Sequence, residues 1–113
     1  MLRISDAQLS DFRAIEAARI KREVHARLEH AFPDLVADRD TVLAWLDELF
    51  DDGFETREHL FETSRTLVQI GQRDDPLAAE ARAAATAILR DRENAPEARL
   101  AFLRAQKLTV PPV

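Results

Sequence analysis

The sequence predicts an all-α fold, a compact bundle of about five helices with a central antiparallel helical hairpin. Apolar residues recur at helical spacing along most of the chain. Only two glycines and no tyrosine occur, whereas alanine, leucine, arginine and glutamate are abundant, a composition that favours helix over sheet. We expect one domain over residues 1–108 and an extended tail over residues 109–113, because Pro111 and Pro112 exclude helix there.

The first helix is expected to begin at a capping box and to end at about Ala31. The Ser5 hydroxyl can accept from the backbone amide of Gln8, and the Gln8 side chain can reach back to Ser5. At the other end, Pro33 disfavours helical geometry at Phe32. We expect a helix of this length to cross more than one neighbour. Its apolar positions are Leu9, Phe12, Ile20, Val24, Leu28 and Phe32.

The central hairpin is expected from two helices, at residues 41–50 and 57–70, joined by a short turn. Each helix carries an apolar stripe, so the two must bury against each other or against the rest of the chain. Asp40 and Thr56 are suited to cap the two N-termini. The two glycines of the chain fall just past the ends of these helices, where glycine is favoured.

Two more helices are expected after the hairpin, at residues 76–93 and 95–106. Asp75 followed by Pro76 is a start signal, a capping residue and then proline at the first helical position. The apolar stripe of the first of these helices is rich in alanine, which permits close helix packing. Asn94 is the expected cap of the last helix.

Negative charge is concentrated in the middle of the chain. Residues 34–62 hold ten acidic residues against Arg39 and Arg57, in a chain whose net charge is −5. Phosphate binding needs a cationic stripe, so this segment argues against a nucleic-acid partner. A basic protein would be attracted to it. A charge run of this kind is also typical of the solvated face of two helices.

A candidate partner-binding surface lies at the corner between the two central helices. Trp45 sits at the edge of an apolar arc, which leaves two interpretations open: a core anchor, or a partly exposed hot spot for a partner. The acidic side chains around it would complement a basic protein. The predicted surface comprises Trp45, Asp47, Glu48, Asp51, Asp52, Phe54, Glu55 and Glu58.

No catalytic, cofactor or metal site is predicted. Asp51, Asp52 and Gly53 invite comparison with a calcium loop. With Gly53 as the sixth loop position, however, the third is Phe50, which has no ligand oxygen, and the twelfth is His59 rather than glutamate. The histidines never join a third ligand in a zinc pattern, and two glycines cannot form a phosphate loop. We therefore expect a protein that is not an enzyme and uses no cofactor.

The expected location is cytoplasmic. The chain has no cysteine, which excludes disulfides and fits a reducing compartment. Its N-terminus lacks the apolar core of a signal peptide. No stretch approaches the ~18 apolar residues of a membrane span, so we expect no membrane partner.

Several short motifs follow one another along nearly the whole chain: Ile4-Ser5-Asp6-Ala7-Gln8-Leu9, Phe12, Phe32-Pro33, Asp52-Gly53-Phe54 with Thr56, Gly71, Asp75-Pro76, Ile88-Leu89-Arg90-Asp91 and Ala98-Arg99-Leu100. This order resembles small helical accessory proteins encoded in bacterial type VI secretion gene clusters, beside spike, spike-tip and effector genes. The chain departs from that pattern at Asp52, where such relatives often carry an aromatic residue, and in a shorter segment over residues 72–77. The resemblance implies an accessory or cognate-binding role around a secreted toxin, with no cofactor and no catalytic residues.

The residues and the resemblance together predict a non-enzymatic protein-binding module, an adaptor or chaperone-like accessory protein for a secreted bacterial effector. One alternative is an immunity-type inhibitor, which would mask a basic toxin surface with the acidic corner of the hairpin. Another is a self-associating structural protein whose apolar stripes complete a homodimer.

Overall fold

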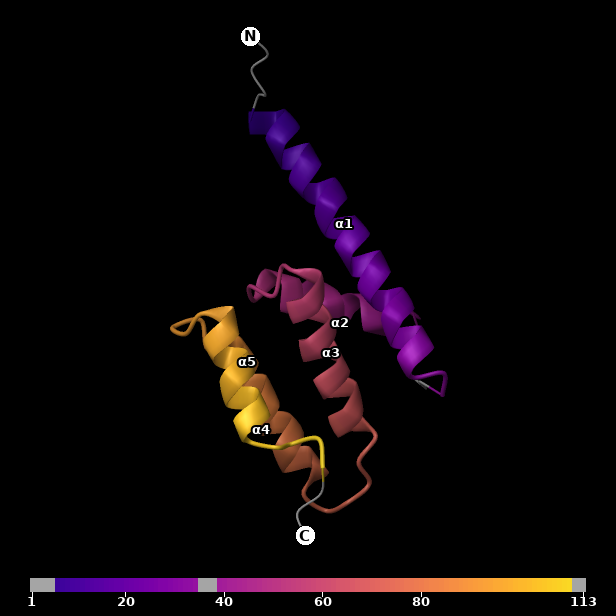
Figure 1. Ribbon diagram of the computed structural model, residues 1–113, viewed down its shortest axis with the longest axis vertical. Coiled ribbons are helices and arrows are strands. Elements are labelled where there is room, and N and C mark those ends of the chain that lie inside the picture. Colours follow the sequence, from indigo (N-terminus) through magenta and orange to yellow (C-terminus); the bar gives the residue numbers. More distant parts are fainter. Residues whose placement is uncertain (1–5, 35–38, 111–113) are drawn as a thin grey trace.

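The structure, a computed structural model, describes residues 6–34 and 39–110 and folds them into five α-helices (Figure 1). The helices are α1 (Asp6–Ala31), α2 (Arg39–Asp51), α3 (Arg57–Gly71), α4 (Ala78–Arg90) and α5 (Pro96–Ala105). The described residues contain no strand. The prediction of an all-α fold with helices packed on one another is confirmed.

Helix α3 is the centre of the packing, because it contacts each of the other four helices. Two small polar side chains on its buried face allow this close approach. Thr63 and Ser64 are both buried, and each hydroxyl donates to the carbonyl oxygen of Leu60, at 3.1 Å and 2.7 Å. Their hydrogen bonds are therefore satisfied within α3, and the neighbouring helices can pack directly over them.

One hydrophobic core joins all five helices. Aliphatic side chains supply most of it, and Trp45 and Phe50 pack at its edge. Its buried members are Ile20, Val24, Leu28, Val42, Leu46, Leu49, Phe54, Leu60, Val68, Ile70, Ala81, Ala85, Leu89, Leu100 and Leu103. Helix α1 contributes to this core only from Ile20 onward.

The N-terminal half of α1 projects beyond the other helices (Figure 1), so Leu9 and Phe12, two of the apolar positions of this helix, lie outside the core. Both side chains are exposed. The reason is length: α1 has 26 residues, whereas its two neighbours α2 and α3 have 13 and 15. The second half of α1 does cross both α2 and α3, as its length predicted.

The turn between α2 and α3 has the predicted chemistry. Thr56 caps α3, since its hydroxyl accepts from the backbone amide of His59 at 3.1 Å. Gly53 has a φ of +111°, a conformation that residues with a Cβ rarely adopt. Asp40, by contrast, lies inside the first turn of α2 rather than capping it. Gly71 is the last residue of α3 and has no positive φ.

Helix α4 is shorter than predicted at both ends, because two aspartates make local hydrogen bonds. The Asp75 carboxylate accepts from the backbone amide of Leu77 at 3.2 Å and from Arg73, and the helix begins at Ala78. At the other end, the Asp91 carboxylate accepts from the amide of Glu93 at 3.2 Å and closes a turn after Arg90.

The last helix and the chain beyond it also differ in detail from the prediction. The Asn94 side chain donates to the Asp91 carboxylate at 2.9 Å, so Ala95 takes the cap position of α5 without a side-chain bond. After α5 the described chain turns through Thr109 and bends at Val110. The Arg73 guanidinium donates to the carbonyl oxygen of Leu108 at 2.6 Å, which fastens this segment. The expectations on Ser5 and on residues 111–113 lie outside the described residues.

Ion pairs join the acidic middle of the chain to its basic flanks. Lys21 of α1 reaches Asp47 of α2 at 2.8 Å. The other pairs of this kind are Glu48–Arg90, Asp52–Arg92 and Glu62–Arg104. Asp47, Glu48, Asp52 and Glu62, four of the ten acids of residues 34–62, are therefore balanced inside the fold.

Three carboxyl groups have pKa values held below the ordinary range, in each case chiefly by a hydrogen bond from an arginine side chain. The pairs are Glu23–Arg57, Glu62–Arg104 and Asp75–Arg73. Burial opposes these shifts, but the arginines outweigh it. Because the folded state holds these groups ionised, the stability they contribute is present at neutral pH and is lost in acid.

Replacing each glycine by alanine should have opposite outcomes. Gly53→Ala should lower the free energy of unfolding by about 2–3 kcal/mol, because φ is +111° and the new Cβ would lie 3.0 Å from Nη2 of Arg99. Gly71→Ala should be neutral or stabilising by up to about 1 kcal/mol, since its Cβ would meet only the flexible end of Arg82. Urea unfolding followed by circular dichroism measures both. Equal losses in the two variants would contradict the assigned turn.

The pH dependence of stability should weaken in Glu62→Gln. The folded pKa of Glu62 lies below its ordinary value of 4.5, so the wild type should lose stability as the pH falls through 4.5 and below. The stability difference between wild type and Glu62→Gln should be largest at neutral pH and should shrink in acid. Urea unfolding at several pH values tests this. Glu93→Gln is the matched control, because Glu93 is exposed and forms no ion pair with another described residue.

Candidate protein-binding groove

A groove of about 200 Å³ opens where α2, α3 and α4 meet. Helix α2 and the residue just after it supply Trp45, Glu48, Leu49 and Asp52, and α3 supplies Leu67. Helix α4 lines the opposite side with Arg82, Thr86, Leu89 and Arg90. Three of the predicted partner-binding residues, Trp45, Glu48 and Asp52, thus meet at one depression in the surface.

The groove is apolar inside and carries both signs of charge at its rim. Trp45 and Leu67 are half-buried, so part of each side chain faces the opening. Glu48 from α2 and Arg90 from α4 approach each other to 3.8 Å across the rim, and both remain mostly exposed. A long, exposed pair of this kind contributes little to stability and can exchange for a contact with a partner.

Trp45 combines the two interpretations that the sequence left open. One side of the indole packs on the core and the rest lines the groove. An indole that is fixed on one side and accessible on the other is well suited to anchor a partner, because little side-chain entropy remains to be lost.

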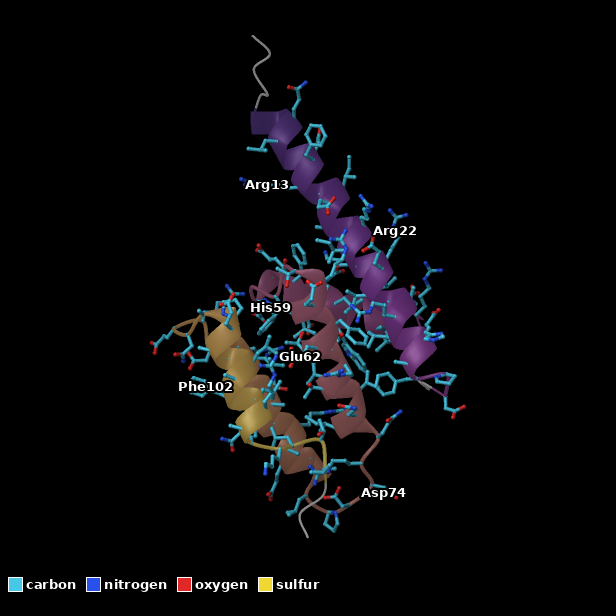
Figure 2. All side chains as sticks on the ribbon, viewed as in Figure 1. Arg13, Arg22, His59, Glu62, Asp74 and Phe102 are labelled. Atoms are coloured by element: carbon cyan, nitrogen blue, oxygen red, sulfur yellow. The ribbon has the colours of Figure 1, made fainter. Side chains whose placement is uncertain are left out.

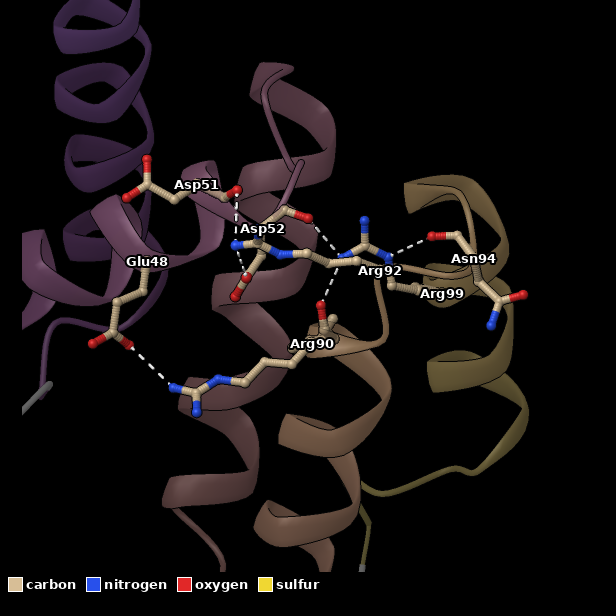
Figure 3. A network of polar contacts seen from close by, with 8 residues as sticks. Glu48, Asp51, Asp52, Arg90, Arg92, Asn94 and Arg99 are labelled. Atoms are coloured by element: carbon tan, nitrogen blue, oxygen red, sulfur yellow. Dashed lines mark hydrogen bonds and ion pairs between the residues drawn. The ribbon is translucent and has the colours of Figure 1, made fainter.

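A buried arginine, Arg99 of α5, holds one end of the groove in place (Figure 3). Its side chain is 3% exposed and donates to three backbone carbonyl oxygens. These belong to Asp52 at 2.7 Å, Leu89 at 2.6 Å and Asn94 at 3.0 Å. The guanidinium also lies over the ring of Phe54, 4.7 Å from its centre. Arg99 therefore connects the C-terminal ends of α2 and α4 to α5.

The sequence reasoning missed the role of Arg99. The one indication of this role in the sequence is the position of Arg99 on α5, beside Leu100 and Leu103, which face the core. Arg104 on the same helix is exposed and pairs with Glu62 instead. Residue type alone cannot distinguish these two arginines, since only the tertiary fold brings three carbonyls to one of them.

The remaining residues of the predicted surface separate into three groups. Asp47 is paired with Lys21 and faces α1 rather than the groove. Asp51, Glu55 and Glu58 are exposed, and their carboxylates form no ion pair with another described residue. Phe54 is 0% exposed, which corrects its assignment to the surface: the turn at Gly53 directs its ring into the core beneath Arg99.

No group of three histidine, aspartate or glutamate side chains among the described residues is placed to hold a metal ion. His25 is buried and lies 3.4 Å from Glu29 on the same face of α1. No buried side-chain polar atom in the described part of the chain is without a hydrogen-bond partner. None of the described helices combines the length and the apolar character needed to cross a bilayer.

Comparison of the chain with models of protein families, with curated proteins and with solved structures gave no match. The proposed function therefore rests on the groove, on its charged rim and on the resemblance of the sequence.

Removing the donors of Arg99 should strongly destabilise the fold. Arg99→Met keeps the aliphatic volume but leaves three carbonyl oxygens without their donor, so we expect a loss of about 3–5 kcal/mol. Arg99→Lys should lose less, because an ammonium group can still reach part of this set. Arg104→Met on the same helix is the control and should cost about 1 kcal/mol or less. Urea unfolding decides between them, and a small effect in Arg99→Met would refute the role assigned here.

Proposed function

We propose that the chain is a non-enzymatic protein-binding module that holds a short segment of one partner polypeptide in the groove between α2, α3 and α4. The observation that carries the proposal is the half-buried Trp45 in the wall of an open apolar groove. In this role the protein acts as an adaptor or chaperone-like accessory protein of a secreted bacterial effector.

The dimensions of the groove support a peptide side chain as its occupant. A volume of about 200 Å³ is below the roughly 300–1,000 Å³ typical of small-molecule and cofactor sites. It suits one large apolar side chain, with Trp45 and Leu67 as the surrounding surface. Recognition of a single anchor residue on a partner is a common arrangement in protein interfaces.

The charges at the rim of the groove indicate which residues should flank the apolar anchor of the partner. Glu48 and Asp52 stand on the α2 side, and Arg82 and Arg90 stand on the α4 side. A segment with a basic residue on one side of its apolar anchor and an acidic residue on the other would match both edges and would bind in one orientation. The effector as partner rests on the resemblance of the sequence to accessory proteins of secretion clusters.

The second candidate function, an immunity-type inhibitor, is favoured by a different observation. The carboxylates of Asp51, Glu55 and Glu58 are exposed and have no ion-pair partner among the described residues. These three residues lie at the end of α2 and the start of α3. Such a surface would attract the basic active site of a toxin through long-range charge, with an affinity that depends strongly on salt.

Titration with the products of genes adjacent to this one tests the proposal. Trp45 is the only tryptophan, so its fluorescence reports occupancy of the groove when the partner is tryptophan-free. Calorimetry covers other partners and the Thr86→Trp variant, which has a second tryptophan. Thr86→Trp should fill the groove and weaken binding by roughly tenfold or more. Asp51→Lys, Glu55→Lys and Glu58→Lys combined should change the affinity by less than about threefold, because these three exposed acids do not line the groove.

The control variant changes the net charge by the same amount at a different place on the surface. Glu80→Lys, Glu93→Lys and Glu97→Lys combined reverse three exposed acids on α4, the following turn and α5. The inhibitor function instead predicts a large loss and a reduced salt dependence in the Asp51, Glu55 and Glu58 variant alone. Undiminished binding by Thr86→Trp would exclude the groove as the site.

A further inference from the structure

The N-terminal half of α1 extends past the other helices, and among its described residues Glu16 is the one that forms an ion pair with another helix, with Arg57 of α3 at 3.4 Å. Between Gln8 and Arg19 no described side chain is fully buried, and most are exposed (Figure 2). Leu9, Phe12 and Ile15 expose 41%, 63% and 64% of their surface. An isolated helix of this length is marginal in water, because few side chains support it. The segment therefore gains stability from any partner that covers these three side chains.

The three apolar side chains form one stripe, the apolar arm of α1. They are three residues apart, so consecutive members are turned by about 60° and the whole arm spans about 120° with Phe12 at its centre. A stripe of that width is what one helix buries against another. The covering element is therefore best matched by a second helix.

The charged side chains on the two flanks of the arm can pair with those of a second copy of the same helix. Asp11 and Arg13 lie about 100° to either side of Phe12, and neither forms an ion pair with another described residue. Glu16 and Arg19, by contrast, bind Arg57 and Glu23 of the same chain, so Asp11 and Arg13 are the charges that flank the arm and remain available to a second copy. When two copies lie parallel, the Asp11 flank of one faces the Arg13 flank of the other. In an antiparallel pair each flank would face its own kind.

We propose that the arm is a dimerisation surface, which pairs in parallel with the same helix of a second copy of this chain. Phe12 lies at the centre of the seam, and Leu9 and Ile15 form the layers on either side of it. The two Asp11–Arg13 contacts close the flanks and set the orientation. This surface shares no residue with the groove, so it is independent of the proposed function.

The rest of the molecule leaves this seam open from Leu9 to Ile15, and the seam ends at Glu16, which binds Arg57 of α3 at 3.4 Å. Ile20 and Val24, which face the core, are turned by about 80° and 120° from the direction of Phe12 around α1. In a parallel pair the two helical bodies therefore fall on opposite sides of the seam. Three apolar side chains per copy are far fewer than the 20–30 residues of a standard interface, so we expect a dissociation constant on the order of 10–1,000 µM.

Sedimentation equilibrium of the full chain, from about 10 µM to about 1 mM, measures the association. Phe12→Glu should weaken it by roughly tenfold or more, because a charge would enter the centre of the seam. Phe102→Glu is the matched control: Phe102 is 51% exposed on α5, far from the arm, and should leave association unchanged (Figure 2). Both substitutions are at exposed sites, so circular dichroism should show intact folding.

Two further variants test the orientation. Asp11→Arg should weaken the dimer by roughly fivefold, since it would face Arg13 of the second copy. Combining it with Arg13→Asp should restore the affinity, because the opposite charges meet again. An antiparallel pair would respond to neither variant in this way, and that result would overturn the proposal. A wild type that stays monomeric at the highest concentration, or equal effects of Phe12→Glu and Phe102→Glu, would overturn it as well.

Thr86→Trp separates this proposal from the proposed function. The substitution fills the groove but leaves the arm unchanged, so the variant should dimerise like the wild type. Coupled loss of partner binding and dimerisation in Thr86→Trp would contradict the assignment of two separate surfaces.

Discussion

The arrangement of the C-terminal half of the molecule depends on the buried guanidinium of Arg99. It meets the carbonyl ends of α2 and α4, through Asp52 and Leu89, where the helix dipoles place negative partial charge. A buried cation is normally stabilised by a carboxylate. Here three carbonyl oxygens and the face of Phe54 stabilise the guanidinium instead. Gly53 is needed beside it, because any Cβ at that position would reach the guanidinium.

This constraint also explains why a groove exists. Helices α2 and α4 both pack on α3 but share at most a marginal contact with each other. Two helices that flank a third without touching leave a channel between them, and side chains close it only in part. Arg99 fixes one end of that channel, and Arg90 reaches across its rim to Glu48. The groove therefore follows from the way α2 and α4 pack on α3, and Trp45 lies in its wall.

The sequence predicted features that depend on a few neighbouring residues. Thr56 as a cap, the left-handed Gly53 and the helical hairpin all follow from local spacing, and the structure contains them. It could not show which apolar residues find a partner, because Leu9 and Phe12 have the same spacing whether or not another helix covers them. Nor could it show that Phe54 turns inward, since that depends on an arginine far away along the chain.

The acidic middle of the chain is a second case in which the sequence alone does not predict which side chains find a partner inside the fold. From the sequence alone, residues 34–62 present a strongly negative segment that would attract a basic partner. In the fold, bases from both flanks reach back to it, for example Lys21 to Asp47 and Arg92 to Asp52. Asp51, Glu55 and Glu58 are the acids of the predicted surface that stay without such a pair among the described residues. Charge segregation along a sequence can thus serve packing of the fold as well as recognition of a partner.

The groove and the arm differ in what they can recognise, and this gives each a separate role. The groove is concave and shaped by three helices, so in the proposed function it would select a partner by the size of one side chain. The arm is a single convex helix face with balanced charges, which selects by register and orientation. A dimer formed through the arms carries two grooves on two bodies. Because a second binding event on the same assembly is intramolecular, even weak grooves would then hold a repetitive partner with an avidity that neither reaches alone.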